Sequence, residues 1–273
     1  MIMINKRIVT IGLLLMFGFA SVGSAQTTLR LAFQLPLNHH LSQNIILFKN
    51  EVEHRSNGRI MVELRDYGSF LEKKTNNEDE IDEDAPQMYF QDGEIGQAVS
   101  GGLIEAGLVS LPRFVKTIPL ADIFYQPFLL DTKRKIQNTV SRDSPVRKAI
   151  ESSIANMGTT VLWWQSYGSV VLVSKGEPIQ NPGQIKDKRV RVFGETLGHL
   201  VLAAGGIPKA ISNSKQYFAY RHRKVDLGMT TVADIRRNKI WDVMDTVSIT
   251  NNASVQFITV VNSRWWNNLN QFN

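Results

Sequence analysis

The alternation of strand-like and helix-like apolar patterns at the start of the chain does most to limit how it can fold. Residues 29–33 form a short, largely apolar run that predicts a strand. Over residues 41–55, apolar side chains recur at steps of four, three and four, which places them on one face of a helix. Ile60, Val62 and Leu64 then alternate with polar residues, as in a second strand. This order favours two parallel strands joined by a crossover helix.

The same alternation continues toward the end of the chain. Further strands are predicted over residues 106–110, 160–164, 170–174, 188–193, 225–229 and 255–261. Helices are predicted over residues 95–99, 131–156, 197–204 and 215–223. The expected class is therefore α/β, with two lobes around a ligand cleft. We expect residues 26–167 to form mainly the first lobe, residues 168–254 mainly the second, and residues 255–273 to begin with a returning strand.

The first 25 residues have the pattern of a secretory signal peptide. Lys6 and Arg7 precede an uncharged stretch from Ile8 to Ala25, which ends in small residues suited to cleavage. Its strongly apolar part is short for a membrane span of about 20 residues, which argues against an anchor. We expect cleavage after Ala25 and export from the cytoplasm.

Composition excludes several kinds of site. The chain has no cysteine, so disulfides, thiol catalysis, cysteine-bound metals and an N-terminal lipid anchor on cysteine are excluded. The formal net charge is +6, of which Lys6 and Arg7 contribute two, and no basic stripe predicts nucleic-acid binding. No metalloprotease, nucleophile-elbow or phosphate-loop motif occurs, so no metal or cofactor is expected.

Six acidic residues fall between Glu78 and Asp84. A calcium loop would need a D-x-D-x-D-G spacing that is absent here. Like charges repel, so the segment over about residues 72–92 is predicted to be a solvated loop.

Several segments occur in the order found in one protein family. The most specific is Pro178–Val192, where the prolines, Lys186, Arg191 and Val192 fit a P-I-x-x-P-x-D-L-K-G-x-K-I-R-V pattern. The others are residues 29–33 with the helix ending at 57–59, and residues 101–110, 126–129, 158–164, 217–226 and 260–266. On these segments, from about residue 28 to its end, the chain resembles the periplasmic solute receptors of TRAP transporters, the DctP type.

The resemblance implies a periplasmic-binding-protein-like receptor that catalyses no reaction. Such a receptor closes its two lobes on a small organic acid in the periplasm and hands it to the membrane subunits of a TRAP-type importer. The family's carboxylate-binding arginine matches Arg191. A guanidinium offers two parallel donors to one carboxylate, and a strand end holds it in place. A surface arginine in a charged strand is the alternative for Arg191.

The chain departs from the family pattern at several places, and three of them bear most on function. Val170 stands where the family often has a second arginine, and Thr230 replaces an amide residue. After the Trp265-Trp266 segment the family continues into further helices. Where these helices are lacking, we expect apolar surface to be exposed. A degenerate, truncated homologue that no longer binds ligand therefore stays open as an alternative.

Seven further residues are candidate ligand contacts: Asn38, His39, Trp164, Tyr167, Phe193, Tyr217 and Thr230. The first two follow the first strand, where the family places ligand-facing residues, and a turn or helix cap is their alternative role. For the aromatic candidates, core packing is the alternative. An exported hydrolase or lyase using His39, Glu105 or Asp226 is a further alternative from another class of protein.

Overall fold

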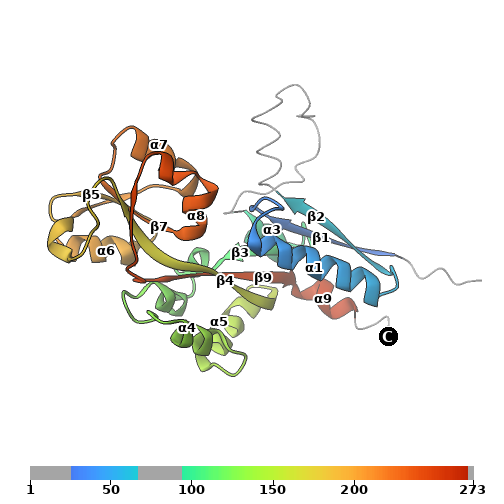
Figure 1. The fold of residues 1–273 in the computed structure, drawn as a ribbon. Coiled ribbons are helices and arrows are strands. Elements are labelled where there is room, and N and C mark those ends of the chain that lie inside the picture. Colours follow the sequence, from blue (N-terminus) through green and yellow to red (C-terminus); the bar gives the residue numbers. More distant parts are fainter. Residues whose placement is uncertain (1–25, 67–93, 270–273) are drawn as a thin grey trace, which may run out of the picture.

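The computed structural model describes residues 26–66 and 94–269, so the predicted signal peptide and acidic loop lie outside the described residues. Two lobes are joined by two long antiparallel strands, β4 (Thr159–Ser174) and β9 (Ser254–Asn262) (Figure 1). Within the described residues the sheet order is β2-β1-β3-β9-β4-β7-β5-β6, and β8 also pairs with β4. The predicted two-lobed α/β fold is confirmed.

The first lobe contains the predicted parallel unit. Strand β1 (Thr27–Phe33) is parallel to β2 (Ile60–Asp66) and β3 (Ala106–Ser110), and α1 (His40–Arg55) crosses between β1 and β2. Leu41 and Ile45 of α1 are fully buried because the apolar stripe of the helix faces the sheet. Helix α3 (Ile95–Ser100) precedes β3, which pairs with β9 in the antiparallel direction.

Strand β4 corrects the prediction of two separate strands at 160–164 and 170–174. It is one continuous strand of 16 residues. The intervening polar residues and Gly168 do not end it, because β9 pairs with this stretch and two irregularities, at Val161/Trp163 and Ser166/Gly168, absorb the mismatch. β4 therefore runs through both lobes, and the predicted lobe boundary near residue 168 stays a prediction.

The second lobe is built around β5 (Arg189–Val192), which is parallel to β6 (Ile207–Ala210) and β7 (Leu227–Thr231). Helix α6 (Glu195–Ala203) follows β5, α7 (Gln216–Arg221) precedes β7, and α8 (Val232–Arg237) follows it. Sequence patterns did not predict β6, α8 or β8 (Thr246–Ser248), which are all short.

The helix predicted over residues 131–156 is instead two helices, α4 (Lys133–Val140) and α5 (Pro145–Ala155). Pro145 lacks a backbone donor and so suits the first turn of α5, while Ser144 caps that helix by accepting a hydrogen bond from the Arg147 amide. Near the C-terminus lies α9 (Ser263–Leu269), and short 3-10 turns cover residues 111–114, 119–125, 182–185, 213–215 and 240–242.

One apolar core runs through both lobes, and a smaller one lies under α7 and α8. No helix in the described ranges has the length and apolarity needed to span a bilayer.

Candidate functional site

Arg191 lies in β5, between the two strands that pair with it, and only 2% of it is exposed. Its Nε donates to the Ile211 carbonyl at 2.9 Å and its Nη1 donates to the Met229 carbonyl at 2.5 Å. The guanidinium also lies 4.9 Å from the centre of the Phe193 ring. Arg191 is therefore a buried arginine held by backbone carbonyls, and the alternative of a surface strand arginine is wrong.

The charge of Arg191 is poorly compensated. Burial lowers its pKa from the ordinary value, while Tyr220 and Asp234 act in the opposite direction. Arginine nevertheless keeps its proton inside proteins. Within the described part of the chain no carboxylate lies within ion-pair distance of Arg191. A buried cation without a partner is costly, so this position suits an incoming anion.

Asp234, in the first turn of α8, accepts hydrogen bonds from several side chains. Its Oδ1 accepts from the Tyr167 hydroxyl at 2.6 Å and from Asn213 Nδ2 at 2.7 Å, and lies 3.2 Å from Arg237. Its Oδ2 accepts from the Thr231 hydroxyl at 3.0 Å. Sequence reasoning missed this residue, although the Thr231-x-x-Asp234 spacing is a helix-start signal, and Thr231 does cap α8.

His39 and Tyr167 connect the first lobe to Asp234. The two rings stack with centroids 5.3 Å apart and 14° between their planes. His39 precedes α1 and accepts a hydrogen bond at Nδ1 from the Leu41 amide at 3.2 Å, so the predicted helix-cap role is confirmed. Burial raises the pKa of Tyr167 far above its usual range, which keeps its hydroxyl protonated as the donor to Asp234.

Thr230 lies in β7 between two residues that already form hydrogen bonds with other members of the site. The preceding Met229 carbonyl accepts from Arg191, and the hydroxyl of the following residue, Thr231, bonds Asp234. Arg191 pairs with Gly228, and alternate residues of a strand share a face, so Thr230 and Arg191 face the same side of the sheet. We call His39, Tyr167, Arg191, Thr230 and Asp234 the Arg191 cluster.

The remaining sequence candidates lie around or away from this cluster. Phe193 packs against Arg191, and Asn38 is exposed beside His39. Trp164 points toward α5, where its Nε1 donates to Glu151 at 2.8 Å, whereas Trp163 contacts Phe48 of α1. The two neighbouring tryptophans therefore face opposite sides of β4, and Trp164 is not brought together with Arg191.

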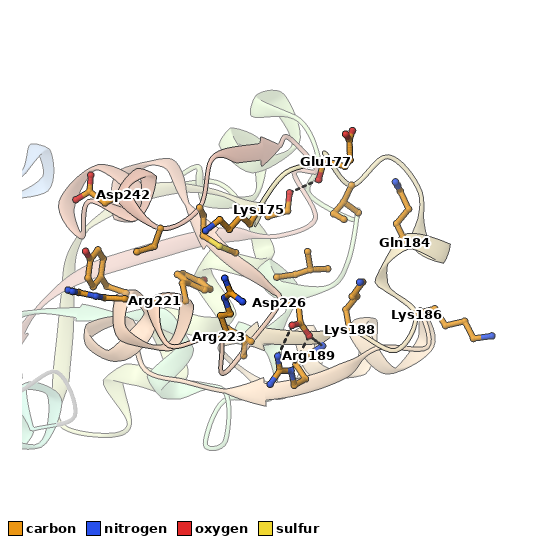
Figure 2. Close-up of a pocket in the computed structure, with 18 of the residues that line it drawn as sticks. Lys175, Glu177, Gln184, Lys186, Lys188, Arg189, Arg221, Arg223, Asp226 and Asp242 are labelled. Atoms are coloured by element: carbon orange, nitrogen blue, oxygen red, sulfur yellow. Dashed lines mark hydrogen bonds and ion pairs between the residues drawn. The ribbon is translucent and has the colours of Figure 1, made fainter.

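Tyr217 lines a separate hollow of about 1060 Å³ on the second lobe (Figure 2). Six basic and three acidic side chains line it together with apolar ones, which include Val225 and Met244. The ion pair between Arg189 and Asp226, at 2.7 Å, lies on its wall. None of the Arg191 cluster lines this hollow, so the two are distinct features of the lobe.

The carboxylates of the alternative hydrolase or lyase are engaged elsewhere. Glu105 forms an ion pair with Arg30 at 2.6 Å, and Asp226 is held by Arg189. Across residues 26–66 and 94–269 no three His, Asp or Glu side chains come together as a metal site would require. Neither of these two carboxylates is therefore free to act as a base on a substrate, whereas Arg191 can pair with a carboxylate.

The burial of His39 predicts a pH dependence of stability. Burial lowers the pKa of His39 from 6.5 to about 4, helped by His40 and Arg237 and opposed by Asp234. Between these values the unfolded chain holds the proton and the folded chain does not, so the unfolding free energy falls as the pH falls. The stability advantage of the native protein over a His39→Gln variant should therefore shrink from pH 7 to pH 4.5 in urea unfolding.

The matched control is His199→Gln, because the side chain of His199 on α6 is 68% exposed. His199→Gln leaves His39 in place, so it reports how acid affects the rest of the fold. An advantage over His39→Gln that does not change with pH would contradict the buried, neutral state of His39.

Comparison with known proteins identifies relatives of this fold and sequence. The profile of bacterial extracellular solute-binding protein family 7, DctP, matches residues 31–271. A curated relative is the C4-dicarboxylate-binding periplasmic protein DctP of Vibrio cholerae, 24% identical over 209 residues, covering 74% of this chain. The match covers 61% of the length of that relative.

Solved structures show the same fold at low sequence identity. An extracytoplasmic solute receptor from Bordetella pertussis that binds pyroglutamic acid has a TM-score of 0.74 and 16% identity, covering 89% of this chain and 73% of its own. A TRAP periplasmic solute binding protein from Pseudomonas aeruginosa with bound L-malate has a TM-score of 0.73 and 19% identity, with 88% and 77% covered. Another, from a Sulfitobacter species, with bound β-D-galacturonate, has a TM-score of 0.74 and 14% identity, with 89% and 74% covered.

Proposed function

The chain belongs to family 7 of the bacterial extracellular solute-binding proteins, the DctP family, and on that premise we propose that it is the extracytoplasmic receptor of a TRAP-type importer that binds a small organic acid through Arg191. The family and fold are those of receptors, not enzymes. The curated relative is a C4-dicarboxylate-binding protein, and the solved relatives carry pyroglutamate, L-malate or a uronate. All of these ligands are carboxylates.

The observation that carries the proposal is the buried charge of Arg191, which has no ion-pair partner among the described residues. Two carbonyls take two of its five N–H donors, which leaves three for a ligand. A carboxylate bound there would supply the missing negative charge, and burial would strengthen the charge-assisted hydrogen bonds. The Phe193 ring, whose centre lies 4.9 Å from Cζ of Arg191, would limit the directions from which a ligand can approach.

The Arg191 cluster also suits a receptor that closes on its ligand. Arg191, Thr230 and Asp234 belong to the second lobe, whereas His39 precedes the first helix of the other lobe. Tyr167 lies on β4, one of the two strands that join the lobes. A ligand that contacts both lobes would favour the closed arrangement because its contacts are complete only there.

The pattern of residues 1–25 supports export to the periplasm, where a membrane partner would receive the ligand. The membrane subunits of a TRAP-type importer are the partners that the family implies. The competing proposal is a homologue that folds but no longer binds, and it differs from the receptor in a measurable way.

The test is thermal unfolding of the purified protein against a panel of small organic acids. A ligand present at a hundredfold its dissociation constant stabilises the native state by about 2.7 kcal/mol. The receptor predicts a saturable rise in unfolding temperature with at least one acid and none with a neutral polyol of similar size. A cooperative transition that no acid shifts would contradict the receptor and favour the degenerate homologue.

A further inference from the structure

Two buried polar atoms of the Arg191 cluster have no hydrogen-bond partner in the part of the chain that the structure describes. His39 is 8% exposed and Thr230 is fully buried, yet His39 Nε2 and Thr230 Oγ1 bond no other described residue. Buried polar groups are almost always satisfied, so two such atoms in one cluster with an unpaired arginine indicate a site built for a polar ligand.

The protonation state of His39 follows from its cap. Nδ1 accepts from the Leu41 amide, so the ring proton of the neutral histidine is on Nε2. Burial keeps the pKa of His39 near 4, so the ring is neutral at pH 7. The unpartnered Nε2 is therefore a neutral N–H donor, and the Thr230 hydroxyl can donate or accept.

The negative charge in the cluster is already present. Asp234 is bonded by Tyr167, Asn213 and Thr231, and the one cation within ion-pair distance of it is Arg237, at 3.2 Å, among the described residues. Arg237 is thereby engaged, and Arg191 is the one buried arginine of the cluster. A second carboxylate on the ligand would be repelled by the charge of Asp234, and the described residues of the cluster offer it no second unpaired cation. The ionised form of that second carboxylate is therefore disfavoured.

We infer that the ligand is a monocarboxylate whose remaining polar groups are uncharged oxygens, placed to accept from His39 and to bond Thr230. This inference rests on the proposed function, because Arg191 must hold the one carboxylate. It names Asp234, His39 and Thr230 as the residues that set specificity, and it separates this chain from a C4-dicarboxylate receptor.

The test compares acids that differ in one charge. Three pairs cover a range of sizes: succinate and its monoamide, glutarate and its monoamide, and D-glucarate and D-gluconate. Calorimetric titration at pH 7 should show that the monocarboxylate of at least one pair binds ten times more tightly than its dicarboxylate. Asp234→Asn should reduce that preference at least fivefold, whereas Asp242→Asn, the same change in an exposed residue of the second lobe, should leave it intact.

Thr230→Val is the second variant, since valine has nearly the shape of threonine without the hydroxyl. It should weaken binding of the preferred monocarboxylate about tenfold, because the ligand oxygen loses its partner, with no loss of thermal stability in the absence of ligand. Unchanged affinity in Thr230→Val would overturn the role of Thr230.

The outcomes separate this inference from the proposed function. Dicarboxylates that bind as tightly as their partners, and lose that affinity in Arg191→Gln, would overturn the inference and leave the receptor standing. Binding that does not depend on Arg191 would overturn both.

Discussion

Replacement of Arg191 by glutamine is expected to weaken carboxylate binding by about 30-fold to more than 1000-fold, the range for removing one partner of a buried, hydrogen-bonded charge pair. Glutamine keeps part of the side-chain volume but loses the charge and the planar fork of donors. Arg191→Lys keeps the charge but cannot bond the Ile211 carbonyl, the Met229 carbonyl and a carboxylate in the same geometry, so it should also bind weakly.

The matched control is Arg189→Gln, two residues earlier in the same strand. Arg189 is paired with Asp226 and lines the separate hollow, so its loss should change affinity by less than about twofold, as expected of a partly exposed ion pair outside the site. The measurement is calorimetric titration with the acid that most stabilises the native protein. Equal losses of affinity in the two variants would contradict a direct contact between Arg191 and the ligand, because a change anywhere in this strand would then have the same effect.

Replacement of Gly228 by alanine is expected to destabilise the protein by about 1–3 kcal/mol or more, the usual cost of overpacking a buried site. A Cβ atom at Gly228 would lie 2.5 Å from Cζ and 2.7 Å from Cε1 of the buried Tyr220 ring, and closer still to its hydroxyl. The ring cannot simply swing outward because it belongs to the core under α7. Gly228 also pairs with Arg191, so the variant should bind ligand more weakly as well.

Replacement of Gly198 by alanine should instead stabilise the protein. Gly198 lies inside α6, and a Cβ there would meet only ordinary contacts at 3.8 Å from Pro208 and 4.0 Å from Val192. Alanine in a helix interior is favoured over glycine by about 1 kcal/mol. Urea unfolding of both variants checks the pair, and Gly228→Ala as stable as Gly198→Ala would contradict the close packing of Tyr220.

The parts of the fold that repeat a local pattern could be predicted from the sequence. The helix at His40–Arg55 and its two parallel strands follow from apolar spacing alone, because one buried face per element is enough to set that spacing. The sequence predicts two strands in place of β4, because the polar residues in its middle lack the apolar pattern of a strand. This stretch is extended because it pairs with β9, which lies about 90 residues away along the chain.

The site was predictable to the extent that single residues carry its chemistry. Arg191 was predicted from a resemblance, and burial of a charged strand residue could not be read from the Arg-Val-Arg-Val pattern. Asp234 was missed because its importance arises from Tyr167 and Asn213, which are 67 and 21 residues away along the chain. Trp164 was predicted for the cleft, but the face it occupies depends on α5, which no local pattern places.

The most direct test of the account is a calorimetric titration of the purified protein, at pH 7, with the stabilising acid and with the methyl ester of the same acid. The ester keeps both oxygens and adds only a methyl group, but it removes the charge that Arg191 is proposed to pair with. The account predicts saturable 1:1 binding of the acid and at least 30-fold weaker binding of the ester, matching the loss in Arg191→Gln. Equal affinity for acid and ester would contradict it, because the buried arginine would then have no part in recognising the ligand.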